Sequence, residues 1–121
     1  TPLHAAADFG GEQLLKILIA HPKIDLNVRD NLGQTPLFFA VRLGDCRLIR
    51  FFLEDNRLDP SQHQGALGNP LHAAAESGRF PALRLLLEDG RFEVNATDQD
   101  GDTPLHIAIQ KGDREDLVLL L

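Results

Sequence analysis

Clusters of leucine, isoleucine and phenylalanine recur along the chain at a constant spacing of 34 residues. Within each cluster the apolar side chains follow one another at intervals of three and four residues, which is typical of a helix with one buried face. The pattern therefore predicts a helix over each of the ranges 14–19, 48–53, 83–87 and 117–121.

A second pattern precedes each cluster and predicts another helix. The tetrapeptide Thr-Pro-Leu-His at position 1 returns as Thr-Pro-Leu-Phe at 35, Asn-Pro-Leu-His at 69 and Thr-Pro-Leu-His at 103. Threonine can cap a helix N-terminus, and proline is tolerated in the first turn because the N–H that it lacks has no partner there. Each of these helices should end at a glycine, which suits the left-handed conformation of a C-cap: Gly10, Gly44, Gly78 and Gly112.

The second helices should begin near Asp45 and Asp113, with Pro81 in the first turn of its own copy. Between units, Asp30-Asn31-Leu32-Gly33 and Asp98-Gln99-Asp100-Gly101 carry the residues of tight hairpin turns. A fixed period of this length marks a repeat architecture. We therefore divide the chain into units 1–34, 35–68, 69–102 and a partial unit 103–121, each reading helix, turn, helix, hairpin loop.

These columns, together with Val94-Asn95-Ala96, resemble ankyrin repeats over the whole chain. The resemblance implies an all-α solenoid of stacked helix-turn-helix units that binds another protein, works without catalysis and has no cofactor. Because the sequence opens on a first helix and stops on leucines inside a second helix, we also expect the segment to belong to a longer chain. The family's usual unit has 33 residues, and the extra residue here falls around Pro22-Lys23, Asn56-Arg57 and Gly90-Arg91.

Unit 35–68 departs from the pattern in three places. Phe38 stands where the other units have histidine, and Pro60-Ser61 replaces the apolar-Asn pair. Leu67 occupies the place of Gly33 and Gly101, while Gly68 follows one residue late. Because a leucine resists positive φ, we expect this hairpin to be reshaped with its glycine shifted. In the last unit, Asp116 stands where the first two units have leucine and Val118 where the others have lysine or arginine, so we expect a rotated or frayed final helix.

Charge and composition exclude several classes of function. The net charge is −6, of which residues 69–102 hold −4, and this balance opposes nucleic-acid binding, which needs a basic stripe. The longest apolar run is five residues, against about 20 for a membrane span. A single cysteine, Cys46, excludes an internal disulfide framework and, with the resemblance, favours a cytoplasmic or nuclear location. We expect a monomeric segment.

The residue types that suggest metal binding or catalysis have structural explanations. His4, His72 and His106 share one column, and ligands on different solenoid turns cannot converge on one ion. The resemblance implies that their rings bond to neighbouring backbone, while His21 and His63 are loop residues without a partner column. Asp98, Asp100 and Asp102 fail the EF-hand spacing of glycine and glutamate. Cys46 has no base patterned beside it, so we expect neither a metal nor a catalytic site.

Two asparagine features are explained by the repeat. Asn95-Ala96-Thr97 is a glycosylation sequon, but it coincides with the repeat's own hairpin step. The column of Asn27 and Asn95 resembles the asparagine that intracellular hydroxylases modify in many ankyrin repeats. The repeat itself accounts for an asparagine in this column, and hydroxylation of Asn27 or Asn95 stays a prediction.

Residues that vary between units are the candidates for partner contacts, because the fold does not need them. By resemblance they line the concave face and the hairpin tips. An apolar anchor is expected near Phe9 and Leu43, and the acidic hairpin 98–102 should favour a basic element on the partner. The candidates are Asp8, Phe9, Arg42, Leu43, Glu76, Ser77, Gln110 and Lys111 at helix ends, and Asn31, Leu32, Gln34, Ala66, Gln99, Asp100 and Asp102 at hairpin tips.

Two alternatives stay open at this point. The repeats could be a structural spacer inside a longer array, with no partner of their own. An enzymatic domain could also lie elsewhere on the parent chain, with the repeats serving it.

Overall fold

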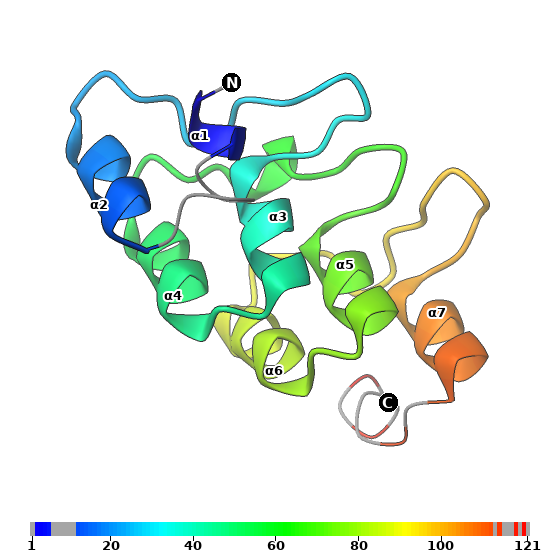
Figure 1. Ribbon diagram of the computed structural model, residues 1–121. Helices are drawn as coiled ribbons and strands as arrows, with labels where there is room; N and C mark the ends of the chain where they lie inside the picture. Colours follow the sequence, from blue (N-terminus) through cyan, green and yellow to red (C-terminus); the bar gives the residue numbers. More distant parts are fainter. Residues whose placement is uncertain (1, 6–11, 113, 115–117, 119, 121) are drawn as a thin grey trace.

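The computed structural model describes residues 2–5, 12–112, 114, 118 and 120 (Figure 1). The predictions for Asp8, Phe9, Gly10 and a helix start at Asp113 lie outside these residues. Within the described ranges the chain is built from helices and loops and contains no strand, which confirms the all-α prediction.

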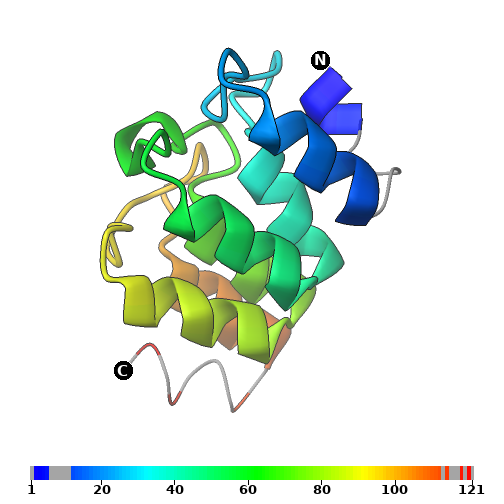
Figure 2. The ribbon, with the colours of Figure 1, turned by 90° about the vertical axis from the view of Figure 1, so that its left-hand side faces the viewer.

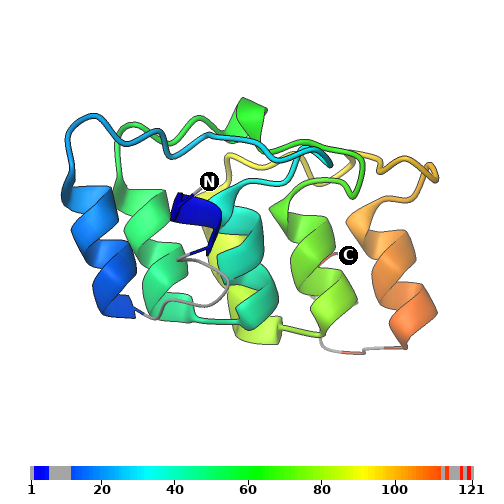
Figure 3. The same ribbon diagram turned by 45° about the horizontal axis from the view of Figure 1, so that its top comes forward.

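The helices form two rows. The first helix of each pair belongs to one row, α1 (Pro2–Ala5), α3 (Pro36–Leu43), α5 (Pro70–Ser77) and α7 (Pro104–Lys111). The second helices form the other row, α2 (Glu12–Ala20), α4 (Cys46–Glu54) and α6 (Phe80–Asp89), which stand in front in Figure 2. Each helix contacts its neighbours in the same row, and the loops between pairs gather along one edge (Figure 3). The helices predicted over 14–19, 48–53 and 83–87 are confirmed, whereas most of 117–121 lies outside the described residues.

The first helices begin as the tetrapeptide predicts, with one exception. The Thr103 hydroxyl accepts the His106 N–H at 3.3 Å, and the Asn69 side-chain oxygen accepts the N–H two residues later at 2.9 Å. Thr35 makes no side-chain cap, so the predicted threonine cap is wrong there. Its hydroxyl instead bonds to His63, 28 residues away.

The helix ends and the second helix starts also follow the sequence. Gly44, Gly78 and Gly112 close α3, α5 and α7 in the left-handed conformation. The Asp45 carboxylate caps α4 by accepting two N–H groups at 3.1 and 3.3 Å, while Pro81 lies in the first turn of α6. The turn between paired helices is therefore short, which holds the two rows in contact.

The core lies between the two rows and repeats with the sequence. Leu15, Ile49 and Leu83 occupy the same column of the second helices, and each is fully buried. Leu37 and Leu71 do the same in the first helices. Because no helix pair can bury its apolar face alone, one core runs continuously from α2 to α6, and a second small cluster of Ala75, Ile107 and Ala108 lies between α5 and α7.

The hairpins at residues 30–34 and 98–102 share one turn geometry. The Asp30 N–H donates to the Gln34 carbonyl at 2.9 Å, and the Asp98 N–H donates to the Asp102 carbonyl at the same distance. The Asp98 carboxylate accepts two further N–H groups inside its turn, each at 2.9 Å. The alternating aspartates therefore build a turn.

Neighbouring hairpins are joined through Ala66. Its N–H donates to the Leu32 carbonyl at 3.2 Å, and its carbonyl accepts the Gln99 N–H at 2.8 Å. These bonds hold the tips of successive hairpins at a fixed spacing along the solenoid.

The hairpin at 65–68 is reshaped, as its sequence predicts. Gly68 has a φ of +90°, while no residue other than glycine has a positive φ in the described chain, so Leu67 is relieved of that conformation. An isolated antiparallel bridge joins Gly65 and Gly68. The short 3-10 helix η2 (Pro60–Gln62) precedes it, in the place where Pro60-Ser61 departs from the repeat.

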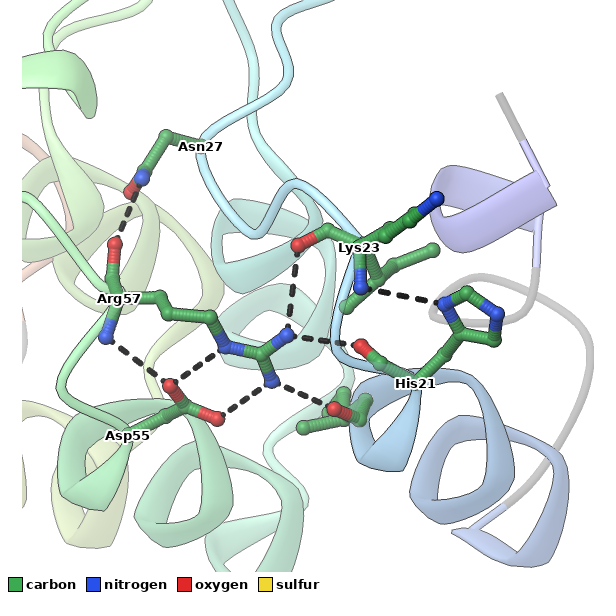
Figure 4. A network of polar contacts seen from close by, with 7 residues as sticks. His21, Lys23, Asn27, Asp55 and Arg57 are labelled. Carbon is green, nitrogen blue, oxygen red and sulfur yellow. Dashed lines mark hydrogen bonds and ion pairs between the residues drawn. The ribbon is translucent and has the colours of Figure 1, made fainter.

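The Arg57 side chain links its own loop to the end of α2 in the preceding unit (Figure 4). Its guanidinium donates to the carbonyls of Ile19 at 2.5 Å and His21 at 2.9 Å, which lie at the end of α2. The same group pairs with Asp55 at 2.8 Å, and this hydrogen bond lowers the pKa of the Asp55 carboxyl. Helix-terminal carbonyls have no partner inside their own helix, so Arg57 supplies one from the next unit.

The same arrangement recurs at the next junction. Arg91 donates to the Leu53 carbonyl at 2.8 Å and pairs with Asp89 at 2.8 Å. Arg57 and Arg91 lie next to the residue that lengthens the usual unit. The longer loop thus carries a side chain that caps the preceding second helix.

Candidate functional site

A groove of about 330 Å³ lies on the face formed by the first helices and the hairpin tips, which we call the inner face. Phe38 and Arg42 of α3 form one wall, and Glu76 and Ser77 of α5 lie beside them. The remaining lining comes from the tip residues Leu67, Asp98 and Asp100, and from His72, Ala73 and Ile107.

Four predicted partner-binding residues line this groove. They are Arg42, Glu76, Ser77 and Asp100. Leu43 and Leu32 lie outside it but are 47% and 53% exposed. The remaining candidates at exposed positions are Asn31, Gln99, Gln110 and Lys111, while Ala66 and Asp102 are half-buried.

The prediction that Gln34 contacts a partner is wrong. Its side chain is only 6% exposed, its N–H donates to the Asp30 carboxylate and its carbonyl lies 2.9 Å from Nε2 of His4. The end of the turn packs inward where the next helix begins, so Gln34 presents no surface to a partner.

The charges around the groove are separated by sign. Asp98 and Asp100 stand on the hairpin side, and neither makes an ion pair with another described residue. Arg42 stands on α3, where its guanidinium lies 6.0 Å from the centre of the Phe39 ring. Glu76 is paired with Lys111 at 2.9 Å. The uncompensated negative charge therefore lies at the hairpin tip.

The histidine column is structural where it is described. His72 is 1% exposed, its Nδ1 accepts the Asn69 N–H at 3.0 Å, and its Nε2–H donates to the Asp102 carbonyl at 2.8 Å. Burial lowers the pKa of His72, so the ring is held neutral. In α7, Nδ1 of His106 accepts the Thr103 N–H at 3.0 Å in the same way.

His63 is a buried structural residue, although its sequence position marks it only as an isolated loop histidine. It is 2% exposed and lies between the Thr35 hydroxyl at 2.5 Å and the Asn27 side-chain oxygen at 3.1 Å. Its ring edge faces Phe92. Burial lowers the pKa of His63 to about 4.

Phe38 and Leu67 are two of the six groove residues that were not predicted to contact a partner, the others being His72, Ala73, Asp98 and Ile107. Phe38 and Leu67 each break a repeat column, and that break is the signal that could have found them. They lie 29 positions apart in the sequence and meet only because successive hairpins stack over the first helices.

The Cys46 thiol lies 3.9 Å from the Gly44 carbonyl. Among the described residues, no three histidine, cysteine or acidic side chains are placed to hold a metal ion. Nor is any helix in the described ranges long and apolar enough to cross a bilayer.

Comparison with known proteins bears on most of the chain. The family model described as ankyrin repeats (many copies) matches residues 3–53 and 71–121. The residues between the two matches include η2, Leu67 and Gly68, where the hairpin is reshaped. A search of curated proteins gave no match. On the family match and the paired-helix solenoid, the chain belongs to the ankyrin repeat family.

Proposed function

We propose that this segment is a non-catalytic module that binds a partner protein on its inner face and hairpin tips. Ankyrin repeats are generally protein–protein interaction modules. The observation that carries the proposal is the groove itself, which gathers Arg42, Glu76, Ser77 and Asp100 from two helices and a hairpin.

The surroundings of the groove support a partner with both apolar and basic elements. Leu43 at the end of α3 and Leu32 at a hairpin tip are exposed, and burying their apolar surface against a partner would favour binding. Asp98 and Asp100 give the hairpin tip a negative charge that a basic residue would complement.

A second function, as inner repeats of a longer array, has one observation in its favour. Leu14 of α2 is 46% exposed, whereas its column mates Leu48 and Ala82 are 2% and 1% exposed. A further helix pair stacked on α2 would cover Leu14 as α2 and α4 cover the others. Such an array could act as a spacer, and the experiment below separates the two functions.

Site-specific photo-crosslinking tests the proposed function. A photoreactive amino acid replaces Leu43 on the inner face or, as a control, Arg84 on α6, whose side chain is 61% exposed. Both proteins are irradiated in lysate from the source cells. We expect a defined protein adduct from position 43 that excess unlabelled wild type competes away, and no such adduct from position 84.

The competitor supplies the second arm of the experiment. Unlabelled protein carrying Arg42→Glu and Leu43→Asp should no longer compete for the adduct. Identical adducts from both positions, or none that wild type competes away, would show that the inner face does not bind a partner and would favour the spacer.

A further inference from the structure

Two of the residues that break the repeat pattern, one in a helix and one in a hairpin, line the same groove. Phe38 replaces the histidine of the other units, and Leu67 replaces the glycine of the other hairpins. Both side chains line the inner groove, where Ile107 and Ala73 adjoin them. The regular residues at these positions would leave this part of the groove polar and open.

The fold accommodates both departures through two residues of the same unit, His63 and Gly68. His63 enters from the loop and bonds to Thr35, in a unit whose own helix-start histidine is missing. Gly68 takes the positive φ that Leu67 would resist. The two apolar side chains are thus accommodated while the solenoid stays regular around them.

The groove has a shape and chemistry that suit a side chain. Phe38 and Ile107 form a floor that is 5% and 6% exposed, and Leu67 rises beside it with 38% exposed. A volume of about 330 Å³ is at the small end of binding pockets, so it fits side chains and not a folded surface. Asp98 and Asp100 border the same space and make no ion pair within the described chain.

We propose that this groove, resting on the protein-binding function above, takes one aliphatic side chain of a partner segment whose neighbouring residue is arginine or lysine. The aliphatic group lies against Leu67 and Ile107, and the cation lies against Asp100 at the hairpin tip. Charge complementarity supports the second half of this assignment, because Asp98 and Asp100 of the next hairpin line the groove, whereas the guanidinium of the lining residue Arg42 lies over the Phe39 ring.

A display library of random dodecapeptides tests this pairing. The library is panned on the wild-type protein, and the binding of enriched peptides is then measured against single-residue variants. We expect enriched peptides to share an aliphatic residue within two positions of arginine or lysine. Leu67→Ser should weaken their binding about tenfold, which is the scale for removing one buried apolar contact.

The matched control is Val94→Ser, because Val94 is 39% exposed and lies outside the groove. It should leave peptide binding unchanged. Asp100→Asn should weaken binding by a few-fold and flatten its dependence on salt, whereas Glu88→Gln on α6 should do neither. If the Leu67→Ser variant does not fold, Leu67→Gly takes its place in the experiment, because glycine is the residue of the other hairpins.

The outcomes separate this proposal from the one on which it rests. Enriched peptides that lack the aliphatic–basic pair, or that bind Leu67→Ser as well as wild type, overturn the groove assignment. If Leu43→Ser or Leu32→Ser weakens the binding of those peptides, the inner face still binds proteins and only the assignment of the groove is wrong. Failure to enrich any peptide sensitive to these three positions contradicts both proposals.

Discussion

Nδ1 of His63 lies 2.5 Å from the hydroxyl of Thr35, across 28 residues of sequence and between two successive loops. Nε2–H donates to the Asn27 side-chain oxygen, and in the neutral ring Nδ1 is then left to accept the hydrogen bond of the Thr35 hydroxyl. In this unit the helix-start position carries Phe38, so the loop histidine supplies the polar contact at the start of α3.

We expect His63 to make the stability depend on pH between about 6.5 and 4. The pKa falls from 6.5 to about 4 on folding because the ring is buried. The unfolded chain therefore binds the proton first, and stability falls as the pH drops through this window. The loss between pH 7 and pH 5 should be about 2 kcal/mol in free energy of unfolding.

His63→Gln provides the comparison, because it keeps hydrogen-bonding groups but does not titrate. Urea unfolding at pH 7, 6 and 5 should show the difference between wild type and variant shrinking as the pH falls. Parallel curves would mean that His63 does not titrate differently in the folded and unfolded states.

Gly68 should tolerate alanine much less well than Gly101. Both have positive φ, +90° and +79°, so alanine is strained at either position by about 1–2 kcal/mol. A Cβ at Gly68 would also overlap Cγ of His72, whose ring is fixed by bonds at both nitrogens. A Cβ at Gly101 would meet nothing within 4 Å. Gly68→Ala should therefore cost a further 1–3 kcal/mol or so in unfolding free energy.

Urea or thermal unfolding of the two alanine variants measures this difference directly. Equal losses would show that the His72 ring moves aside, and that the backbone conformation alone makes glycine necessary at position 68.

Arg57→Met should destabilise the protein by about 2 kcal/mol, because it removes bonds to the carbonyls of Ile19 and His21 and leaves Asp55 without its partner. Arg84→Met is the control. Its pair with Glu88 is an exposed one within a single helix, with side chains 61% and 62% exposed, so its loss should be below about 0.5 kcal/mol.

Denaturant unfolding of both variants, with the transition monitored by circular dichroism, compares the two arginines. Similar midpoints would indicate that Arg57 does not couple α2 to the next unit. A drop confined to Arg57→Met supports its role across the junction.

Much of the fold could be predicted from the sequence because its signals are local and repeated. Helix starts at proline, ends at glycine and the shifted Gly68 need only neighbouring residues, and the structure confirms them. The prediction for Gln34 fails because a polar residue after a turn normally faces solvent, whereas this one is buried. Its burial comes from the stacking of the next helix, which the local pattern does not contain.

The groove and the His63 contact could not be predicted for a related reason. Phe38 and Leu67 are visible as breaks in their columns, but the sequence does not say that both face one space. His63 and Thr35 likewise pair through tertiary packing alone. The Arg57 bonds are partly visible in the sequence, because Asp55 and Arg57 recur 34 residues later as Asp89 and Arg91. The carbonyls to which these arginines donate are not visible there.

Returning the two departing residues to the repeat pattern tests the central claim most directly. The variant Phe38→His with Leu67→Gly carries the residues that other units have at these positions. Its affinity for a peptide selected on the wild-type protein is measured by isothermal titration calorimetry, with circular dichroism confirming the helical fold. We expect a folded protein whose affinity is at least about tenfold lower. Unchanged affinity in a folded variant would contradict the claim that these residues build the binding groove.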